Sequence, residues 1–388
     1  MDFSLSVEER DIQMWVRTFV DREIRPLEEQ ALRNERGGRP GVEPETIRAL
    51  QLKAREAGFW GVQNPSEFGG MGLSAVMGAI IEMELGRSFI RFRFGGSADN
   101  ILYGCNDEQR EQYLLPTIEG ERVSCFALTE PGAGSDATAI RTSATRDGDD
   151  WIINGEKVFI TQGSEADFAM VFAVTDKSLG ANGGITCFLV DRDMGWKSEP
   201  IHTMGEWGPA SLVFENVRVP GTHVLGEVGY GFSLAMEWIG KARWGVPARA
   251  IGACDRLIQM GIDYANTRET FGKPIAERQA IQWMLADSAV ETDAARLLTL
   301  NAAWRGDQGK DSRHANSQAK LYGANVANEV VDRVLQIHGG MGYTRELPIE
   351  RWYRELRLAR IYDGTDEIQR KTIARNLLKG NVVMGELG

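Results

Sequence analysis

One loop combines glycines, hydroxyl groups and acids in a pattern suited to ligand binding. Residues 128–136 read LTEPGAGSD, so a strand-like run passes into a loop with two glycines, Thr129, Ser135 and two acids. A loop of this kind exposes backbone N–H groups, which can bind an anionic or carbonyl-bearing ligand. A plain glycine-rich turn accounts for the segment equally well, so both interpretations stay open at this point.

A second segment places a guanidinium group and an aromatic ring between two helical stretches. Residues 268–274 read RETFGKP, and Gln279 follows shortly after. Arg268 can bind phosphate through paired hydrogen bonds, and Phe271 can stack against a flat ligand. A helix–helix connection that binds nothing is the simpler interpretation of this segment taken alone.

A third segment, residues 361–370 (IYDGTDEIQR), precedes the last predicted helix. Asp363 or Thr365 is suited to cap that helix, and the helix dipole favours Asp366 and Glu367 in its first turn. Capping explains Thr365 and the two acids after it well. It explains an acid and a glycine directly before the cap less well.

Charge and composition argue against several kinds of partner and against a metal site. The 388 residues include 55 acids against 44 Lys and Arg, a net charge of −11, with no long basic run; this argues against nucleic acid or an anionic membrane as the main partner. The four cysteines and four histidines lack the short spacings of disulfide frameworks and zinc sites, so no metal is expected. The start of the sequence lacks the apolar core of a signal peptide, and no apolar run reaches membrane-spanning length. We therefore expect a soluble protein of the cytoplasm or another intracellular compartment.

Familiar nucleotide and nucleophile motifs are missing from the sequence. Neither GxGxxG after a strand nor GxxxxGK[ST] occurs, and the glycine-rich run at 338–342 follows a helical stretch, which argues against a Rossmann fold. The nucleophile elbow GxSxG is missing as well. The chemistry is therefore expected to need a bound organic cofactor or a carboxylate.

Changes in hydrophobic periodicity divide the chain into three parts. Apolar residues recur at helical spacing from about 5 to 118, where Pro44 suits a first helical turn. Helical spacing returns after residue 229, with Pro247 interrupting the first helix. We expect helices at about 232–266, 276–306, 312–338 and 366–379, and strands at 151–153, 158–161, 169–174 and 185–190, with turns at 147–150, 154–155 and 181–184. The predicted domains are 1–120 (helical), 121–228 (β) and 229–388 (helical).

Five ordered segments together resemble the acyl-CoA dehydrogenase family over nearly the whole chain. They are residues 129–136 (TEPGAGSD), 154–161 (NGEKVFIT), 268–272 (RETFG), 336–342 (QIHGGMG) and 362–365 (YDGT). Five segments in the family's order are far more specific than any one of them. The resemblance implies an α+β, mainly α fold, with a helical N-terminal domain, a β-barrel-like middle domain and a C-terminal four-helix bundle.

The resemblance also implies FAD as the cofactor and places its contacts along the chain. Leu128 and Thr129 would meet the pyrimidine edge of the flavin, and Thr161 would bond near N5. Phe159 would form an aromatic wall where the family usually has Trp. The other implied cofactor residues are Phe126, Ser135, Arg268, Phe271, Gln279, Gln336, Gly339, Gly340, Thr365 and Glu367. Because the 268–279 and 336–340 contacts reach across a subunit interface in the family, at least a dimer is implied, and a homotetramer is expected.

Asp363 is the implied catalytic base, although the family usually has Glu before Gly-Thr. Its shorter side chain withdraws the carboxylate by roughly 1 Å, a displacement that can cost about 100-fold in rate unless the substrate or the backbone has moved. A branched-acyl subgroup places its base immediately before the Arg matched by Arg243, where this chain has Ala242. The implied substrate contacts are Ser135, Arg243 and Gly364.

One segment departs from the family pattern, and a second has two possible interpretations. Residues 205–211 lack the Arg of the usual Gly-x-Arg-x-Ser, so the CoA contacts of that segment are not carried over. Residues 87–94 (RSFIRFRF) match the region that builds the acyl pocket. Their arginines could meet a substrate carboxylate, or more simply face solvent. Four tryptophans in helices are expected in the core or at an interface, namely Trp238, Trp244, Trp283 and Trp304.

The sequence therefore predicts an FAD-dependent acyl-CoA dehydrogenase that forms 2,3-enoyl-CoA and passes electrons to electron-transfer flavoprotein. A nitroalkane oxidase is the alternative, because that oxidase branch of the same fold uses Asp as its base. Ser135 and Arg243, which suit CoA, favour the dehydrogenase. A non-catalytic helical binding protein is the third hypothesis.

Overall fold

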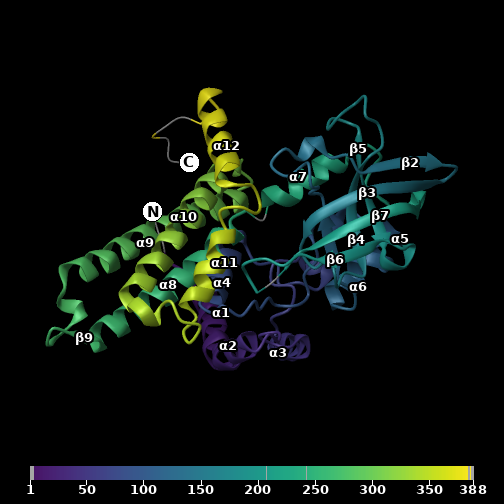
Figure 1. Ribbon diagram of the computed structural model, residues 1–388. Helices are drawn as coiled ribbons and strands as arrows, with labels where there is room; N and C mark the ends of the chain where they lie inside the picture. Colours follow the sequence, from purple (N-terminus) through teal and green to yellow (C-terminus); the bar gives the residue numbers. More distant parts are fainter. Residues whose placement is uncertain (1–3, 207, 242, 383–384, 386–388) are drawn as a thin grey trace. The chain divides into compact units, whose positions relative to one another are not determined.

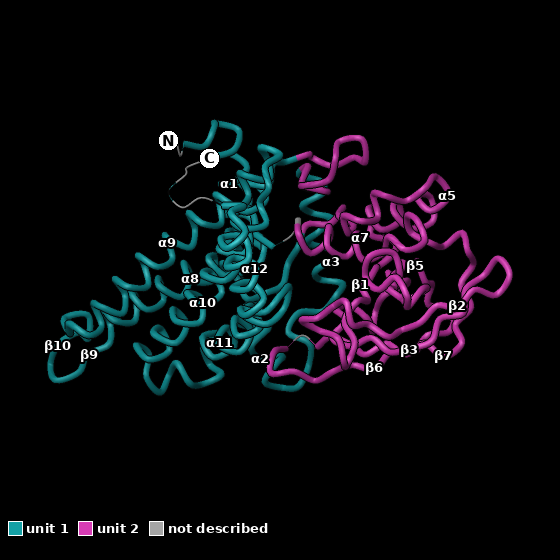
Figure 2. The backbone as a smooth tube through the Cα atoms, turned by 90° about the horizontal axis from the view of Figure 1, so that it is seen from above, with its two compact units in different colours: residues 1–57, 73–93, 241–388 teal, residues 58–72, 94–240 magenta. Residues whose placement is uncertain are grey.

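The chain forms two compact units in a computed structural model, which describes residues 4–206, 208–241, 243–382 and 385. Unit 1 contains residues 1–57, 73–93 and 241–388, and unit 2 contains residues 58–72 and 94–240 (Figure 2). Residues 94–120 thus group with the sheet, and the three-domain division stays a prediction. No helix in the described ranges has the length and apolar character needed to cross a membrane.

Unit 1 consists almost entirely of helices. Ser6 and Glu9 form a reciprocal capping box at the start of its first helix, and Pro44 occupies the first turn of another, as predicted. The elements are α1 (Val7–Phe19), α2 (Glu28–Arg36), α3 (Pro44–Glu56), α4 (Ala75–Gly86), α8 (Gly245–Thr267), β9 (Glu269–Thr270), β10 (Lys273–Pro274), α9 (Gln279–Asp307), α10 (Arg313–His338), α11 (Ile349–Leu358) and α12 (Asp366–Leu378).

Long helices running side by side form the core of unit 1 (Figure 1). The helix α8 packs closely against α4, and a Cβ atom on Gly252 would lie 1.9 Å from the carbonyl oxygen of Met83. The helices predicted at 276–306, 312–338 and 366–379 are α9, α10 and α12. The helix predicted at 232–266 is instead two helices, and Pro247 lies in the first turn of the second, where its missing N–H is tolerated.

Unit 2 is built around one sheet with strands in the order β6-β7-β3-β2-β4-β5-β8, and β1 pairs with β4 in parallel. One face of β4 packs Ala169 and Val171 into one apolar core, and the other packs Phe168 and Met170 into a second. The elements are α5 (Asp107–Gln109), α6 (Leu115–Glu119), β1 (Ser124–Ala127), β2 (Ser143–Asp147), β3 (Asp150–Ile160), β4 (Phe168–Val174), β5 (Ile185–Asp191), β6 (Lys197–Pro200), β7 (Ala210–Pro220), β8 (Val224–Leu225) and α7 (Gly231–Lys241).

The turn predicted at Asn154–Gly155 is wrong, because both residues lie inside the continuous strand β3. The pairing of β3 with β7 shifts register between Ile153 and Gly155, which marks a bulge. Gly155 has φ +151°, and a Cβ atom there would lie 2.4 Å from Thr142 Oγ1. The glycine therefore permits close approach of a neighbouring chain segment, and the strands predicted at 151–153 and 158–161 belong to one strand.

Candidate active site

A buried ion pair in unit 2 fixes the loop that follows β1. The Glu130 carboxylate accepts hydrogen bonds from the backbone N–H groups of Arg141 and Thr142, at 2.6 and 2.9 Å. Lys157 Nζ on β3 lies 2.8 Å from Glu130 Oε1 and donates to Leu128 O at 3.0 Å. Lys157 therefore anchors both neighbours of Thr129, through the carbonyl oxygen of Leu128 and the carboxylate of Glu130.

No sequence motif identifies the role of either member of this pair. Lys157 is completely buried, and removal from water lowers its pKa to about 8, although Glu130 acts to raise it. Desolvation acts to raise the pKa of Glu130, but the nearby Lys157 ammonium leaves it lowered overall. The sequence signal for the pair is Lys157 itself, a charged residue at an inward position of a strand. A buried charge requires a partner of opposite charge, which here is Glu130.

The loop after β1 and the end of β3 bring five predicted site residues, Leu128 among them, into one region of unit 2. The backbone N–H of Val158 donates to Thr129 O at 2.9 Å, which joins the two segments. Phe159 is 62% exposed and has φ +59°, next to a second register shift in β3. A positive φ is unfavourable for a residue with a bulky side chain, so the backbone at Phe159 is strained. Local strain of this kind is found at functional sites. Thr161 and Ser135 are also exposed.

Phe126 lies against aromatic neighbours in the same unit. Its ring stacks on Trp238 of α7 with centroids 4.2 Å apart and also contacts Phe172 at 4.8 Å. Trp238 donates a hydrogen bond from Nε1 to Asp99 at 2.7 Å, so it is a packed residue, as predicted. Trp283 and Trp304 are instead 59% and 40% exposed, so the core does not account for them.

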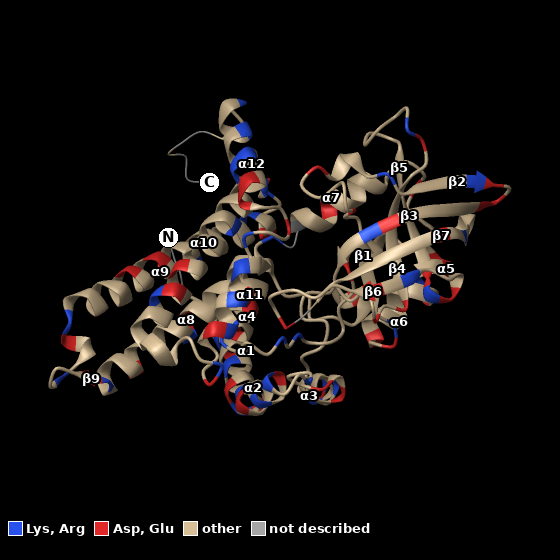
Figure 3. Ribbon diagram, viewed as in Figure 1, with Lys and Arg blue, Asp and Glu red and all other residues tan. Residues whose placement is uncertain are grey.

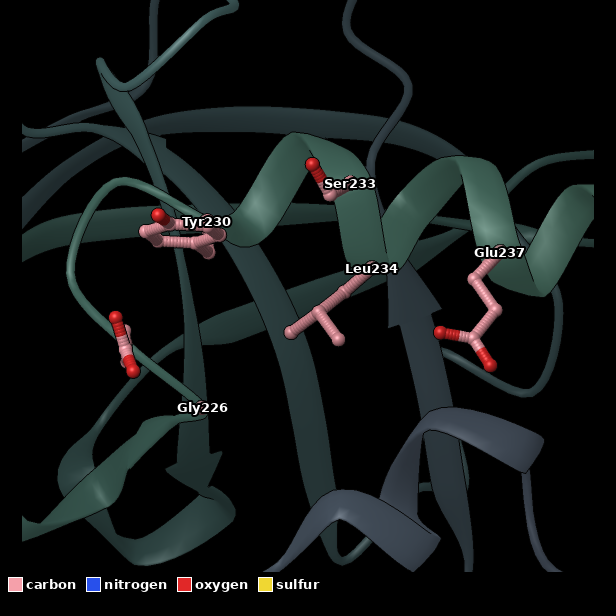
Figure 4. Close-up of a pocket in the computed structure, with 6 residues that line it drawn as sticks. Gly226, Tyr230, Ser233, Leu234 and Glu237 are labelled. Carbon is pink, nitrogen blue, oxygen red and sulfur yellow. The ribbon is translucent and has the colours of Figure 1, made fainter.

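A hollow of about 320 Å³ lies at the start of α7 and holds none of the predicted site residues. Figure 4 shows the side chains that line it. Tyr230 and Ser233 line it together with two carboxylates, and the full lining is Gly226, Glu227, Tyr230, Ser233, Leu234 and Glu237. Two acids disfavour the phosphates of a nucleotide. We therefore do not assign this hollow to a phosphate-bearing ligand.

Asp363 of unit 1 lies in a strained and tightly held stretch of backbone between α11 and α12. Its φ is +53°, in the left-handed region that non-glycine residues seldom adopt. The Gln369 side chain donates to the carbonyl oxygens of Asp363 and Gly364, at 3.1 and 3.0 Å, and Lys320 Nζ donates to Gly364 O at 2.7 Å. Both holding side chains are fully buried. Sequence patterns do not reveal their role, because single polar residues in helical patterns normally face solvent.

The carboxylate of Asp363 has no hydrogen-bond partner among the described residues, whereas its backbone carbonyl is bonded. The side chain is half-buried and makes no hydrogen bond or ion pair with any described residue. Removal from water raises the pKa of this carboxyl group. The positive charges of Lys320, Arg243 and Arg93 oppose that shift without cancelling it. Asp363 is thus a carboxylate with raised proton affinity and free acceptor capacity, as a general base requires.

The last helix does not use Asp363 as its cap. Thr365 is the N-cap residue of α12, and its hydroxyl accepts from the backbone N–H of Ile368 at 3.3 Å. Glu367 is exposed in the first turn. The capping interpretation therefore applies to Thr365 and leaves Asp363 without that structural role.

Arg243 approaches the same stretch of backbone. A Cβ atom built on Gly364 would lie 3.6 Å from Arg243 Nη2, and Arg243 Nε is buried with no hydrogen-bond partner in the described structure. An unpartnered buried donor beside a carboxylate points to a ligand that is absent from the chain itself. Ala242, the alternative base position, and Trp207, in the segment that departs from the family, lie outside the described residues.

The remaining predicted cofactor residues gather at one end of unit 1. Phe271 and Gly272 form the two-residue turn of the β9–β10 hairpin, both with positive φ, and Phe271 is 97% exposed. Tyr264 at the end of α8 stacks on His338 at the end of α10, with ring centroids 4.3 Å apart. This contact joins the hairpin to the end of α10, and the exposed residues there are Arg268, Gln279, Gln336, Gly339 and Gly340.

The Asp363 group and this hairpin group lie at different ends of α10. Lys320 contacts the backbone after Asp363, whereas Gln336 lies about 24 Å further along the helix axis at 1.5 Å per residue. Within unit 1, the predicted base and the predicted pyrophosphate contacts are therefore separate surfaces.

Models of three domains of one protein family match consecutive parts of the chain. The acyl-CoA dehydrogenase N-terminal domain matches residues 6–121, the middle domain matches 125–217, and the C-terminal domain matches 229–378. The matches follow the order in which the five sequence segments occur.

Individual relatives match over almost their full length. A 3-(aryl)acrylate reductase from Clostridium sporogenes is 39% identical, with 95% of this chain and 98% of that protein covered. The mitochondrial short-chain specific acyl-CoA dehydrogenase of Homo sapiens is 37% identical, with 94% and 88% covered. The structure of butyryl-CoA dehydrogenase from Megasphaera elsdenii matches with a TM-score of 0.86 at 31% identity, over 97% of this chain and all of that one. The mainly helical fold with one sheet region is confirmed, and the chain belongs to the acyl-CoA dehydrogenase family of oxidoreductases.

Proposed function

We propose that this chain removes the α-proton of an acyl-CoA thioester through Asp363 and so forms a 2,3-enoyl-CoA. The observation that carries the proposal is the Asp363 carboxylate, which is half-buried, has a raised pKa and has no partner among the described residues. FAD, when bound, supplies the acceptor for the β-hydride. Electron-transfer flavoprotein is the proposed onward electron acceptor.

The residues present fit FAD at two separate surfaces. In unit 2, an exposed aromatic ring held at positive φ and the hydroxyls of Thr129 and Thr161 suit the flavin end. In unit 1, the hairpin presents Arg268 for phosphate and the almost fully exposed Phe271 for contact with a flat ring. Solvent exposure of a large aromatic side chain in a strained conformation is better explained by a ligand than by folding stability.

The residues around Asp363 position the base. Gln369 binds the carbonyl oxygens of Asp363 and Gly364, and Lys320 also binds that of Gly364. These hydrogen bonds hold the backbone of the base in place while its carboxylate takes up a proton. Arg243 places a positive charge beside the reacting region, where it favours the ionised form of Asp363 before proton transfer. Ser135 and Arg243 are the proposed contacts to the thioester portion of the substrate.

The proposed assembly is a homo-oligomer, at least a dimer and expected to be a tetramer. The base and the hairpin group lie at different ends of α10, so a second copy would bring the two surfaces together. The outer face of α9 also carries large apolar side chains spaced seven residues apart, with exposures of 59%, 70%, 51% and 40% for Trp283, Val290, Leu297 and Trp304. An apolar row of this spacing favours packing against another helix.

Anaerobic flavin reduction tests the activity. The purified chain with bound FAD is mixed with straight, branched, cyclic and dicarboxylic acyl-CoAs, and loss of flavin absorbance is followed. Bleaching by at least one thioester is expected. No bleaching across the panel would overturn the proposal, and peroxide release with nitroethane would favour a nitroalkane oxidase.

Replacing Asp363 tests the base separately from binding. Asp363→Asn should retain FAD and lower α-proton exchange with deuterium by about 100-fold or more, because general bases contribute factors of this size. Asp366→Asn is the matched control, since Asp366 is a buried acid that pairs with Arg360 at 2.8 Å. It should lower thermal stability while exchange persists. Unchanged exchange in Asp363→Asn would remove Asp363 from the mechanism.

A further inference from the structure

A carboxylate in unit 2 connects three elements around the aromatic ring of Phe126. Asp99 directly precedes the short 3₁₀ helix η4 (Asn100–Gly104). Its Oδ1 accepts a hydrogen bond from Trp238 Nε1 on α7 at 2.7 Å, and its Oδ2 accepts one from Ser124 Oγ on β1 at 2.8 Å. Ser124 and Phe126 are two residues apart on β1, so their side chains lie on the same face of the strand. Asp99 therefore joins α7 to the face of β1 that carries Phe126.

Trp238 links Asp99 to Phe126 through two different parts of its ring system. The N–H group that binds Asp99 lies in the plane of the indole, whereas a face of the indole stacks on Phe126, with ring centroids 4.2 Å apart and planes 13° apart. Phe126 also packs against Phe172, with centroids 4.8 Å apart. The hydrogen bond thus fixes the ring on which Phe126 packs, two residues before the predicted flavin contact Leu128.

No cation pairs with Asp99 in the part of the chain that the structure describes. Asp99 is half-buried, and its carboxylate makes no ion pair with a described residue. The neighbouring strands β1 and β4 contain no charged residue, and β5 contains only Asp191 at its end, so these strands are almost wholly tan in Figure 3. The charge of Asp99 acts to raise the pKa of Tyr103 and of Cys125, both of which desolvation raises to about 12. A half-buried carboxylate without a cation is unfavourable for folding, which points to a role in function.

We propose that Asp99 is a positioning residue of the flavin site, which acts through Trp238 to hold Phe126 in the orientation that FAD requires. The proposal rests on the FAD site proposed above and adds two residues that lie outside its sequence motifs. Because the hydrogen bond to Asp99 fixes the indole ring before FAD binds, less conformational freedom is lost on binding. A binding residue that is held in this way depends on the residues that support it.

A purely structural role is the alternative for the bond between Trp238 and Asp99. Tyr113 provides a matched comparison, because its hydroxyl donates to Asp191 over the same distance of 2.7 Å in the same unit. Asp191 also pairs with Arg122, so its charge is balanced. The ring of Tyr113 contacts Phe168 and His223, and neither is a predicted site residue. The two hydrogen bonds therefore have similar chemistry, but only Trp238 stacks on a predicted cofactor residue.

Titration of the full-length, flavin-free chain with FAD tests the role of Asp99. Asp99→Leu and Trp238→Phe should each weaken FAD binding by about 2- to 30-fold, the range expected when a mutation acts through an intervening residue. Asp99→Asn keeps an acceptor for the indole N–H and should restore most of the affinity. Tyr113→Phe is the matched control, which should lower the melting temperature and leave the dissociation constant for FAD unchanged. Trp238→Phe keeps an aromatic ring and removes the N–H, so the test stands even if Asp99→Leu does not fold.

A double variant shows whether Asp99 acts through Trp238. If it does, adding Asp99→Leu to Trp238→Phe should cause no further loss of FAD affinity. Near-UV circular dichroism of the flavin-free chain gives a readout that does not depend on FAD. The Trp238 signal, obtained by subtracting the spectrum of Trp238→Phe, should be lost in Asp99→Leu and kept in Asp99→Asn.

Three results would overturn the inference. Additive losses in the double variant would show that Asp99 does not act through Trp238. Unchanged FAD affinity in Asp99→Leu or in Trp238→Phe would show that their hydrogen bond serves stability alone. Either result leaves the proposed function intact. If the unmodified chain binds no FAD, the proposed function fails and this inference fails with it.

Discussion

Asp363 combines two features that oppose folding. Its left-handed backbone conformation is unfavourable for Asp, and the burial of its carboxyl raises the pKa. A carboxyl group whose pKa is higher in the folded than in the unfolded chain contributes stability at low pH, which is lost as pH rises through the folded value. At neutral pH the ionised group therefore costs stability. Because Asn tolerates positive φ, Asp363→Asn should not lower the melting temperature.

The pH dependence of catalysis should reveal the raised pKa of Asp363. The base must be ionised, so kcat/KM should fall as pH drops through that pKa, and the acidic limb should lie above the ordinary Asp value of about 3.9. Arg243→Gln removes a cation that opposes the shift and should move the limb to still higher pH. Arg243→Lys keeps the charge and should leave it nearly in place. An acidic limb at or below the ordinary value would contradict this account.

At the scale of elements, the Glu130–Lys157 pair connects strand β3 to the loop after β1. Lys157→Met should destabilise the protein by about 3 to 5 kcal/mol, because Glu130 would remain buried without its cation. Changing both residues to Met should recover part of that loss. Free energies of unfolding from urea titration, with FAD content measured in parallel, would check this.

The exposed pair Lys197–Glu215 provides the comparison for this experiment. Their nitrogen and oxygen atoms also lie 2.8 Å apart, but the side chains are 73% and 67% exposed. Lys197→Met should therefore have little effect on unfolding. Similar losses for both lysines would show that burial does not decide the importance of the Lys157 pair.

The elements also show how much of the site sequence reasoning can predict. Long helices such as α9 and α10 were predicted close to their observed bounds, because their apolar periodicity persists over many turns. The turn predicted at Asn154–Gly155 is wrong because the same dipeptide occurs in hairpin turns and in strand bulges. Pairing with strands that are distant in the sequence decides between the two. The roles of Lys320 and Gln369 could not be predicted, because they depend on how the chain folds around Gly364, which both side chains contact.

At the scale of the whole molecule, the net charge of −11 conceals local clusters of the opposite sign. The arginines near Asp363 and at the hairpin lie in a chain with an excess of acids, so placement rather than composition creates a surface for anions. The hairpin surface and the Asp363 surface belong to the same unit but lie at different ends of α10. A complete site assembled from two chains would use both.

Mixing two inactive variants tests whether one chain completes the site of another. Asp363→Asn lacks the base, and Arg268→Ala lacks the proposed phosphate contact, so each should be inactive alone. If sites in a symmetric dimer pair Asp363 of one chain with Arg268 of the other, the mixed dimer contains one intact site and one doubly defective site. Random pairing of equal amounts should then restore about a quarter of the sites, measured as flavin reduced per chain. Failure to regain activity after verified mixing would show that Asp363 and Arg268 serve the same site within one chain.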